Sequence, residues 1–425
     1  GDELEHLELI APLGRQLHAV RWWTGLLVCD LSMCAPATAS LDGVVWPPKL
    51  QELRLPLCYD HPVERVEWPQ TLKRFYMGES LDQEVVRMRW PPDLEDLRVP
   101  FLTVPAVVRA MEVALKGGKA VIVGGILWGL NRLLMDPDGE DDAVNETVEL
   151  STLALAALHD YASHPAVVEA AWEAIAWLAS ATAHSDALLD AGVVQKVGAL
   201  LSTVVHAPPT AAAAGVVSAA LDAVAGLADF SWQLLLDQGI GEAVDAMLRH
   251  VAQQPLLRRS INVSTVCHCV VELMEGTRAQ DARGSPDELP VGLASSGAEL
   301  LKLAVREMHS GETDLRAPDT RLWGTHTPTW QLAKALLRML RLCASGGGGQ
   351  REVLLQTEGF AESLVELAML VNSIGEEQAV GAGAGHQDRL SFFDILVIFK
   401  PICELAVVLA KGGGEGRRLL ADAGL

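Results

Sequence analysis

Apolar and polar residues alternate at a fixed spacing in the first part of the chain. Tryptophans stand 22 residues apart, at Trp46, Trp68 and Trp90, and apolar residues follow each of them at offsets of 4, 7 and 9. The last two apolar positions flank one other residue, and this alternation is typical of a short strand with one buried face. A proline follows each tryptophan and disfavours a helix there. The pattern therefore predicts a series of short, evenly spaced strands.

A weaker copy of the same pattern begins at Trp22, 24 residues before Trp46. It keeps apolar residues at the three offsets: Leu26, Cys29 and Leu31. A fixed period of this size is typical of stacked repeats, in which one unit cannot bury its apolar face alone and packs on the next. The N-terminal part is therefore expected to be an elongated array with a large surface for recognition.

The repeated phrase also resembles a known family. Its pattern is Trp-Pro-x-x-Leu-x-x-Leu-x-Leu, followed by a corner at Tyr59-Asp60-His61-Pro62-Val63 and again at Leu81-Asp82-Gln83-Glu84-Val85. Over about residues 20–103 this is similar to the FNIP type of leucine-rich repeat. The resemblance implies that the strands line a concave face. It also implies that Asp60 and Asp82, which replace the family's usual asparagine, bond the backbone of the neighbouring turn. In the second corner a leucine and a glutamate stand where the family has an aromatic residue and a proline.

From about residue 104 onward, alanine, leucine and valine recur at helical spacing. One apolar stripe contains Ala171, Ala174, Ile175 and Leu178, which predicts a helix with one buried face. Glycines also recur, each four positions after a leucine. This pattern predicts a helix, a sharp turn and a second helix at Gly192, Gly239, Gly297, Gly359 and Gly424.

These helical units resemble armadillo-type repeats. Residues 188–194 (Leu-Leu-Asp-Ala-Gly-Val-Val) are close to the turn of that family, and residues 236–240 are nearly as close. The resemblance implies a second helix in each unit that faces a binding groove. The asparagine that the family places in this groove has no evident counterpart here. The polar segments are expected to be loops between units: 278–292, 310–327 and 372–389.

Together the two patterns predict a mixed repeat protein. Residues 1–103 are expected to form a short leucine-rich-repeat β-solenoid of FNIP type, and residues 104–425 a predominantly α, armadillo-like α-solenoid. The chain ends at Leu425, directly after the fifth glycine of the series. A turn without a following helix leaves a helix pair half built, so the second array is expected to be truncated at its C-terminus.

The charge of the chain narrows the class of partner. Among 425 residues, 33 are basic and 55 are acidic, which gives a net charge of −22. A negative surface repels phosphate backbones and anionic lipid headgroups, so we expect neither nucleic-acid nor membrane binding. It is compatible with a basic protein partner. Seven irregularly spaced cysteines and the absence of a visible leader favour a reducing compartment, the cytoplasm or the nucleus.

Motifs for catalysis and metal binding are weak in this chain. Gly117-Gly118-Lys119 lacks the other residues of a phosphate-binding loop and is expected to break a helix. In Cys267-His268-Cys269, neighbours on a helix point in different directions and cannot close one tetrahedral metal site. No serine-nucleophile elbow or kinase motif set occurs in the sequence. We therefore expect no catalytic residue, no metal site and no cofactor, in a protein that is not an enzyme.

The resulting hypothesis is an interaction scaffold or adaptor that binds protein partners on the concave faces of both arrays, with its oligomeric state left open. The candidates on the first array are the strand positions at offset 8, namely Arg54, Tyr76 and Arg98. Those on the second array are Lys196, Glu242, Asp245, Glu299, Glu362 and Glu366. Two alternatives stay open. One is a substrate-receptor subunit of a ubiquitin ligase, by analogy of architecture. The other is the targeting arm of a larger enzyme whose catalytic domain lies outside this fragment.

Overall fold

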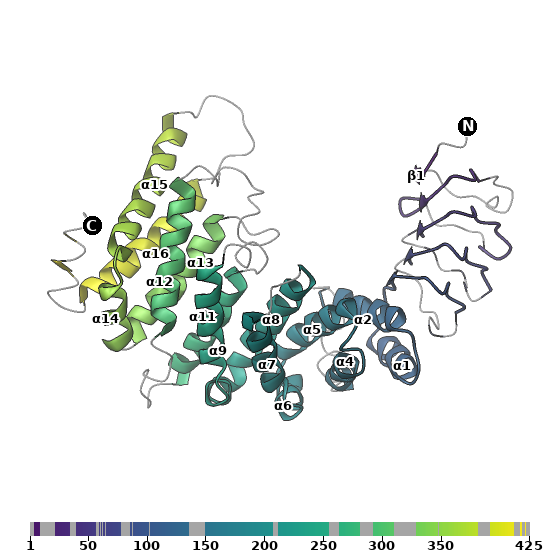
Figure 1. The fold of residues 1–425 in the computed structure, drawn as a ribbon, viewed down its shortest axis with the longest axis horizontal. Coiled ribbons are helices and arrows are strands. Elements are labelled where there is room, and N and C mark those ends of the chain that lie inside the picture. Colours follow the sequence, from purple (N-terminus) through teal and green to yellow (C-terminus); the bar gives the residue numbers. More distant parts are fainter. Residues whose placement is uncertain are drawn as a thin grey trace. The chain divides into compact units, whose positions relative to one another are not determined.

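The computed structural model describes residues 4–8, 22–34, 40–56, 59, 61, 63, 65–77, 86, 88–101, 103–135, 149–206, 211–254, 263–280, 292–309, 329–346, 348–380, 392–411, 417–418 and 421. Asp60, Asp82 and Gly424, for which the sequence predicts roles in turns, lie outside these residues. The described chain is mostly helical, with a five-stranded parallel sheet at the N-terminal end (Figure 1). It divides into two compact units, Gly1–Ala191 and Gly192–Leu425.

The sheet consists of short strands that pair in chain order and all run parallel. They are β1 (His6–Glu8), β2 (Val28–Asp30), β3 (Glu52–Arg54), β4 (Arg74–Tyr76) and β5 (Asp96–Arg98). β2 to β5 each follow a tryptophan at the same distance, so the predicted strands are confirmed, including the one after Trp22. The sequence pattern does not predict β1, which pairs His6 with Val28.

A stack of tryptophan rings accounts for the spacing of the repeat. The ring centres of Trp22 and Trp46 are 5.8 Å apart, those of Trp46 and Trp68 6.1 Å, and those of Trp68 and Trp90 6.2 Å. The last three rings are at most 8% exposed, and the middle residue of each strand from β2 to β5 is buried with them. Within the described residues, the indole N–H groups of Trp22, Trp46 and Trp68 have no hydrogen-bond acceptor. Ring stacking and apolar burial therefore hold the array together, and each 22- to 24-residue repeat packs on the next.

The sheet is followed, in the same unit, by helices that pack on each other. They are α1 (Val104–Leu115), α2 (Ala120–Leu134), α4 (Glu149–Asp160), α5 (Pro165–Ala179) and α6 (Thr182–Asp190). The predicted helix break at residues 117–119 separates α1 from α2. α2 packs on β5, and α5 packs on α2. A Cβ atom at Gly125 would lie 2.7 Å from the carbonyl oxygen of Leu97, so this glycine lets α2 approach the strand closely.

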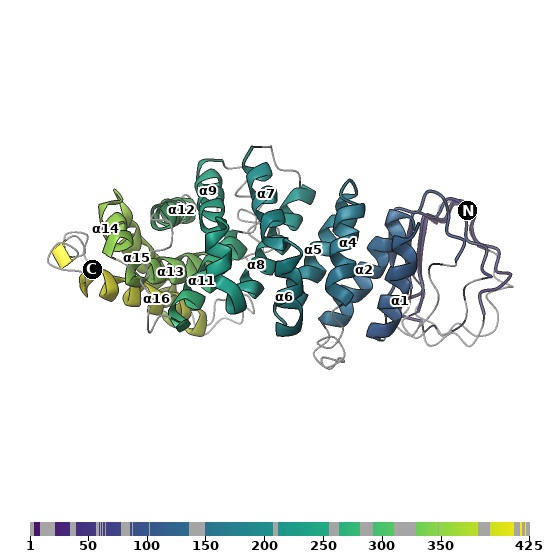
Figure 2. The same cartoon turned by 90° about the horizontal axis from the view of Figure 1, so that it is seen from below.

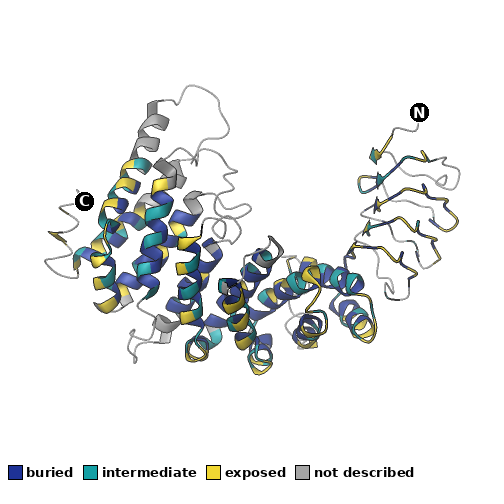
Figure 3. Cartoon of the chain, in the orientation of Figure 1, coloured by how far each residue is buried: buried dark blue, intermediate teal, exposed yellow. Residues whose placement is uncertain are grey.

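The second unit is helical throughout its described part. Its helices are α7 (Val193–His206), α8 (Ala211–Asp237), α9 (Ile240–Gln253), α11 (Val263–Gln280), α12 (Gly292–His309), α13 (Thr329–Gly346), α14 (Gly348–Gln356), α15 (Phe360–Val380) and α16 (Phe392–Lys411). They pack in two rows, because α8, α11, α13 and α16 contact one another in that order, and so do α7, α9, α12 and α15. Figure 2 shows α7 and α9 side by side. In Figure 3 the buried residues gather where helices of one unit face each other.

The glycine turns are confirmed at three of the predicted positions. Gly192, Gly239 and Gly359 have φ angles of +74°, +78° and +73°, in the left-handed region that favours glycine, and each directly precedes a helix. The prediction for Gly297 is wrong, because this residue lies inside α12. A Cβ atom there would overlap the end of the Met339 side chain and lie 3.0 Å from Cδ2 of Leu340. Gly297 therefore allows α12 to pack closely on α13 instead of forming a turn.

The other predicted boundaries hold in part. Thr103 is the N-cap residue of α1, so the strands give way to helices at the position that the composition indicates. The helices up to α6 nevertheless belong to the same compact unit as the sheet, and the division of domains at residues 103 and 104 stays a prediction. The prediction of a loop at 372–389 is wrong up to Val380, because α15 continues to that residue; the rest of this segment lies outside the described residues. Among the described helices, none is by itself long and apolar enough to cross a membrane; two bent pairs reach that length and composition together.

Candidate functional site

One face of the sheet carries the three strand residues that the sequence singles out. In each strand from β2 to β5 the middle side chain enters the core, so the first and third side chains lie on the opposite face. Arg54 is the register partner of Tyr76, and Tyr76 is the register partner of Arg98. The guanidinium groups of Arg54 and Arg98 each lie 4.9 Å from the centre of the Tyr76 ring. The phenol ring is therefore held between two cations.

Acidic residues fix these arginines in place. Glu52 is 6% exposed and accepts hydrogen bonds from Nε of Arg54 (2.8 Å) and Nε of Arg74 (2.7 Å). The hydroxyl of Tyr76 donates to Asp96 at 3.1 Å. Desolvation and the adjacent charge of Asp96 raise the pKa of Tyr76, so the phenol remains a proton donor. The three arginine side chains still expose between 44% and 48% of their area, and the face is thus both ordered and accessible.

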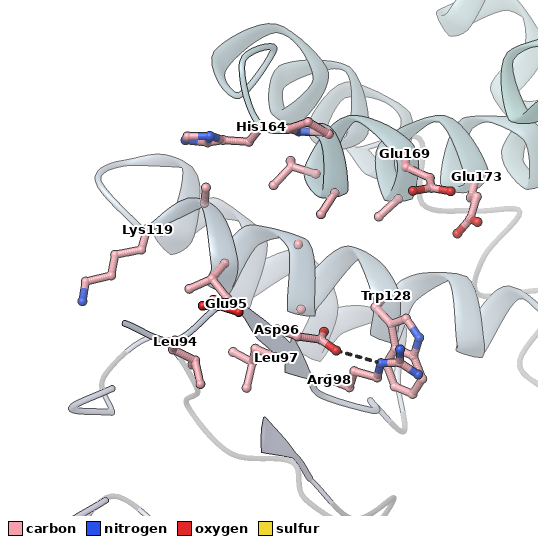
Figure 4. Close-up of a pocket in the computed structure, with 18 of the residues that line it drawn as sticks. Leu94, Glu95, Asp96, Leu97, Arg98, Lys119, Trp128, His164, Glu169 and Glu173 are labelled. Carbon is pink, nitrogen blue, oxygen red and sulfur yellow. Dashed lines mark ion pairs between the residues drawn. The ribbon is translucent and has the colours of Figure 1, made fainter. Parts of the chain in front are cut away.

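A groove of about 620 Å³ opens beside the last strand, between β5, α2 and α5 (Figure 4). Arg98 joins it to the face of the sheet, because its guanidinium also lies 5.5 Å from the centre of the Trp128 ring in α2. Figure 4 shows Trp128, Glu169 and Glu173 toward one end of the groove, and Lys119 and His164 toward the other. The middle of α2 contributes small residues to the wall, which leaves the space open.

The carboxylates of the groove differ in their partners. Glu95 pairs with Lys73 at 2.8 Å and Asp96 pairs with Arg98 at 3.6 Å. Glu169 and Glu173 have no cationic partner among the described residues. Desolvation raises the pKa of both carboxyl groups, and the charge of Glu169 adds to the effect at Glu173. A hydrogen bond from Nδ2 of Asn131 to Glu173 (3.0 Å) acts in the opposite direction.

The candidates of the second unit fall into two groups. Glu242 on α9 and Glu362 and Glu366 on α15 are exposed. Lys196 on α7 and Glu299 on α12 are half-buried, and Glu299 accepts a hydrogen bond from the neighbouring Lys302 at 2.8 Å. These five side chains are available on the surface of the unit to different degrees, and no direct bond between any two of them is found in the described part.

Asp245, which the sequence pattern predicts to bind a partner, is instead buried inside the second unit. It is 4% exposed and accepts hydrogen bonds from Ser296 (2.7 Å) and Arg249 (2.8 Å). Its carboxylate lies directly against Gly292, the first residue of α12, where a negative charge stabilises the helix N-terminus. Asp245 therefore joins α9 to α12 inside the unit, and helical periodicity alone does not distinguish this position from an exposed one.

Two other pairs of side chains are of types that act as nucleophiles or bases in enzymes: Ser151 with His184, and Cys267 with Cys269. Oγ of Ser151 lies 2.9 Å from Nδ1 of His184, a distance typical of a nucleophile and its base. Both side chains are 0% exposed, so a substrate cannot reach them. Cys267 and Cys269 are buried, and burial raises the pKa of both thiols, which keeps them protonated and unreactive. Within the described residues no group of three or more His, Cys, Asp or Glu side chains is placed to hold a metal ion.

The sequence pattern does not predict the groove. Glu169 and Glu173 lie far along the chain from β5, and only the packing of α5 on α2 brings them to the end of the sheet. One signal points there, namely the glycines at positions 124, 125 and 129 within a single apolar helix. Glycines at helical spacing indicate that another segment approaches the helix closely.

Comparisons with known proteins give little further guidance. No family model matches the chain, and no curated protein matches it. Among solved structures, an engineered protein determined by the Northeast Structural Genomics Consortium is 17% identical; the match covers 76% of this chain and 74% of that one, with a TM-score of 0.35. A likeness of this size does not bear on the function or on the site.

Proposed function

We propose that this chain is an interaction scaffold that binds protein partners without catalysing a reaction. In this proposal the sheet belongs to an array of FNIP-type leucine-rich repeats, and the two rows of helices belong to an armadillo-like α-solenoid. The observation that carries the proposal is the in-register series of Arg54, Tyr76 and Arg98 on an accessible face of the sheet.

The chemistry of this face supports binding to a protein. Tyrosine and arginine are enriched among the residues that dominate binding energies at protein interfaces. Here Tyr76 is held by two cation–π contacts and a hydrogen bond to Asp96, so little side-chain freedom remains to be lost on binding. The buried Glu52 also holds two arginines with their planar groups accessible. A face ordered in advance is what a recognition surface requires.

The second unit is proposed to offer a separate surface. Its candidates are one cation and four carboxylates: Lys196, Glu242, Glu299, Glu362 and Glu366. Together with the net charge of −22, they favour a basic partner there.

Quantitative affinity capture from native cell extract tests the proposal. The full chain is compared with the Arg54→Ala/Arg98→Ala variant and with a control, Arg109→Ala/Lys116→Ala, which removes one exposed cation from α1 and one from its C-cap. A partner that is recovered with the wild type and the control, and lost with the first variant, supports the sheet face as the binding surface. Equal recovery with all three proteins contradicts it. Recovery of ubiquitin-ligase subunits in stoichiometric amount would favour the substrate-receptor alternative.

A further inference from the structure

We propose that the groove between β5, α2 and α5 binds an arginine side chain from an extended segment of the partner protein. The inference rests on the proposed function, since it identifies the chemistry of a partner that binds along the sheet. It concerns a different set of residues, because Glu169, Glu173 and Trp128 lie outside the sheet. The two proposals can therefore fail separately.

The groove has the size and the position for such an occupant. Its volume of about 620 Å³ falls within the range of roughly 300–1,000 Å³ that is usual for ligand pockets. One wall is the strand β5, whose Asp96 and Arg98 also belong to the sheet face. A partner segment that contacts Tyr76 on β4 therefore reaches the groove at the neighbouring strand, β5.

The charges of the groove select a cation. Arg98 is already engaged by Asp96, Tyr76 and Trp128. Lys119 lies toward the opposite end from the carboxylates of α5 (Figure 4). Glu169, which is half-buried, and Glu173, which is exposed, both line the groove and have no cation as a partner in the described part of the chain. A positive group placed between these two carboxylates restores the interactions that desolvation removes.

The aromatic wall favours arginine over other cations. Trp128 is half-buried, and its ring already accepts one guanidinium group in a cation–π contact. A planar guanidinium also presents several N–H donors that match carboxylate oxygens, and it carries less tightly bound water than an ammonium group. An arginine can therefore contact the ring and both carboxylates of α5, whereas a lysine offers a single point charge.

A titration of the full chain with Nα-acetyl-arginine amide tests the proposal. The tryptophans carry ¹⁵N on the indole nitrogen, and the Trp128 signal is assigned with the Trp128→Phe variant. A saturable shift of the Trp128 signal is expected with the arginine amide, and none with the neutral citrulline amide. In the Glu169→Gln/Glu173→Gln variant the affinity should fall about tenfold or more, equivalent to at least about 1.4 kcal/mol.

Two further variants separate the site from the general negative charge of the chain. Asp186→Asn/Asp190→Asn removes two exposed carboxylates with the same four-residue spacing from α6 and should leave the affinity unchanged. Gly124→Leu changes no charge and places a side chain in the groove, where a Cβ atom has an ordinary 3.6 Å contact with Val167; it should abolish the shift. Circular dichroism confirms that each variant is folded.

The outcomes distinguish this inference from the proposed function. A shift that does not saturate, or that weakens equally in the α5 and α6 variants, overturns the arginine site. Arg54→Ala lies outside the groove and tests the sheet face alone. If Arg54→Ala reduces partner capture while the arginine amide gives no saturable shift, the scaffold proposal stands and the groove inference fails. If the shift is as expected while Arg54→Ala leaves capture unchanged, the groove inference stands and the sheet-face proposal fails.

Discussion

The guanidinium group of Arg98 lies 4.9 Å from the centre of the Tyr76 ring in the neighbouring strand. The same group lies 5.5 Å from the Trp128 ring in α2. Arg98 thus connects the ordered face of the sheet with the groove beside it. A single residue therefore links the two surfaces to which we assign binding.

Tyr76 is expected to stabilise the sheet through its ring more than through its hydroxyl. Tyr76→Phe removes the hydrogen bond to Asp96 and should lower the free energy of unfolding by about 0.5–1.5 kcal/mol. Tyr76→Ala also removes both cation–π contacts and should cost clearly more. Urea denaturation of both variants measures the difference. Equal losses in the two variants would show that the arginines gain nothing from the ring.

The tryptophan stack should be most sensitive at its centre. Trp68 contacts Trp46 and Trp90, and its ring centre lies 4.5 Å from that of Phe75. Trp68→Ala is therefore expected to lower the stability of the array by about 3–5 kcal/mol. Trp22→Ala should cost less, because Trp22 stacks on one ring at the end of the series. Denaturation followed by near-ultraviolet circular dichroism makes the comparison, and a larger loss at Trp22 would contradict the stack.

Adjacent glycines in α2 should respond in opposite directions to alanine. In Gly125→Ala the new Cβ atom would lie 2.7 Å from the Leu97 carbonyl oxygen, which forces α2 away from β5 and destabilises the unit. In Gly124→Ala the Cβ atom makes an ordinary 3.6 Å contact with Val167, so the higher helix propensity of alanine should stabilise the protein by up to about 1 kcal/mol. Thermal melts of the two variants provide the test. Similar shifts of the same sign would refute the close packing of α2 on β5.

The carboxylates of the groove should reduce stability at neutral pH. The pKa values of Glu169 and Glu173 are raised in the folded protein by desolvation, so the native state binds protons more tightly than the unfolded chain. Stability is therefore lost as the pH rises through these values. Glu169→Gln/Glu173→Gln should be more stable than the wild type at neutral pH, and the difference should shrink as the pH falls below the raised pKa values. Urea midpoints of both proteins across this pH range provide the measurement. A variant that is less stable than the wild type at neutral pH would contradict the raised pKa values.

Asp245 should matter for folding and not for binding. Asp245→Ala removes the acceptor of Ser296 and Arg249 and is expected to cost about 1.5–3 kcal/mol. Glu242→Ala, on an exposed part of the same helix, should change stability by less than about 0.5 kcal/mol. Chemical denaturation of both variants distinguishes them. A loss at Glu242 as large as that at Asp245 would mean that burial does not separate their roles.

The sheet was predictable because its signals are local and repeated. The alternation around Leu53, Phe75 and Leu97 predicts strands with one buried face, and the fixed spacing of the tryptophans places their rings on one another. β1 lacks such a phrase, and its middle residue Leu7 is only half-buried, so little in the sequence identifies it. Strands are thus predictable here where a complete unit repeats.

The incorrect predictions concern residues whose environment is set by packing between segments far apart in the sequence. A leucine followed by a glycine four positions later predicts the turns before α7, α9 and α15, but at Gly297 the same pattern serves the packing of α12 on α13. The helical pattern assigns Asp245 to the surface of α9. In the structure α12 packs on α9, and Ser296 of α12 donates a hydrogen bond to the Asp245 carboxylate. The groove depends on the packing of α5 on α2, which no local pattern encodes.

Photo-crosslinking from position 76 tests the central claim most directly. Tyr76→p-benzoylphenylalanine keeps an aromatic ring on the sheet face, and Arg109→p-benzoylphenylalanine places the same group on the exposed side of α1 as a control. After irradiation in native extract, position 76 should yield a discrete crosslinked protein that excess unlabelled wild-type chain suppresses, and position 109 should not. The same products from both positions, or none from position 76, would contradict binding at the face formed by Arg54, Tyr76 and Arg98.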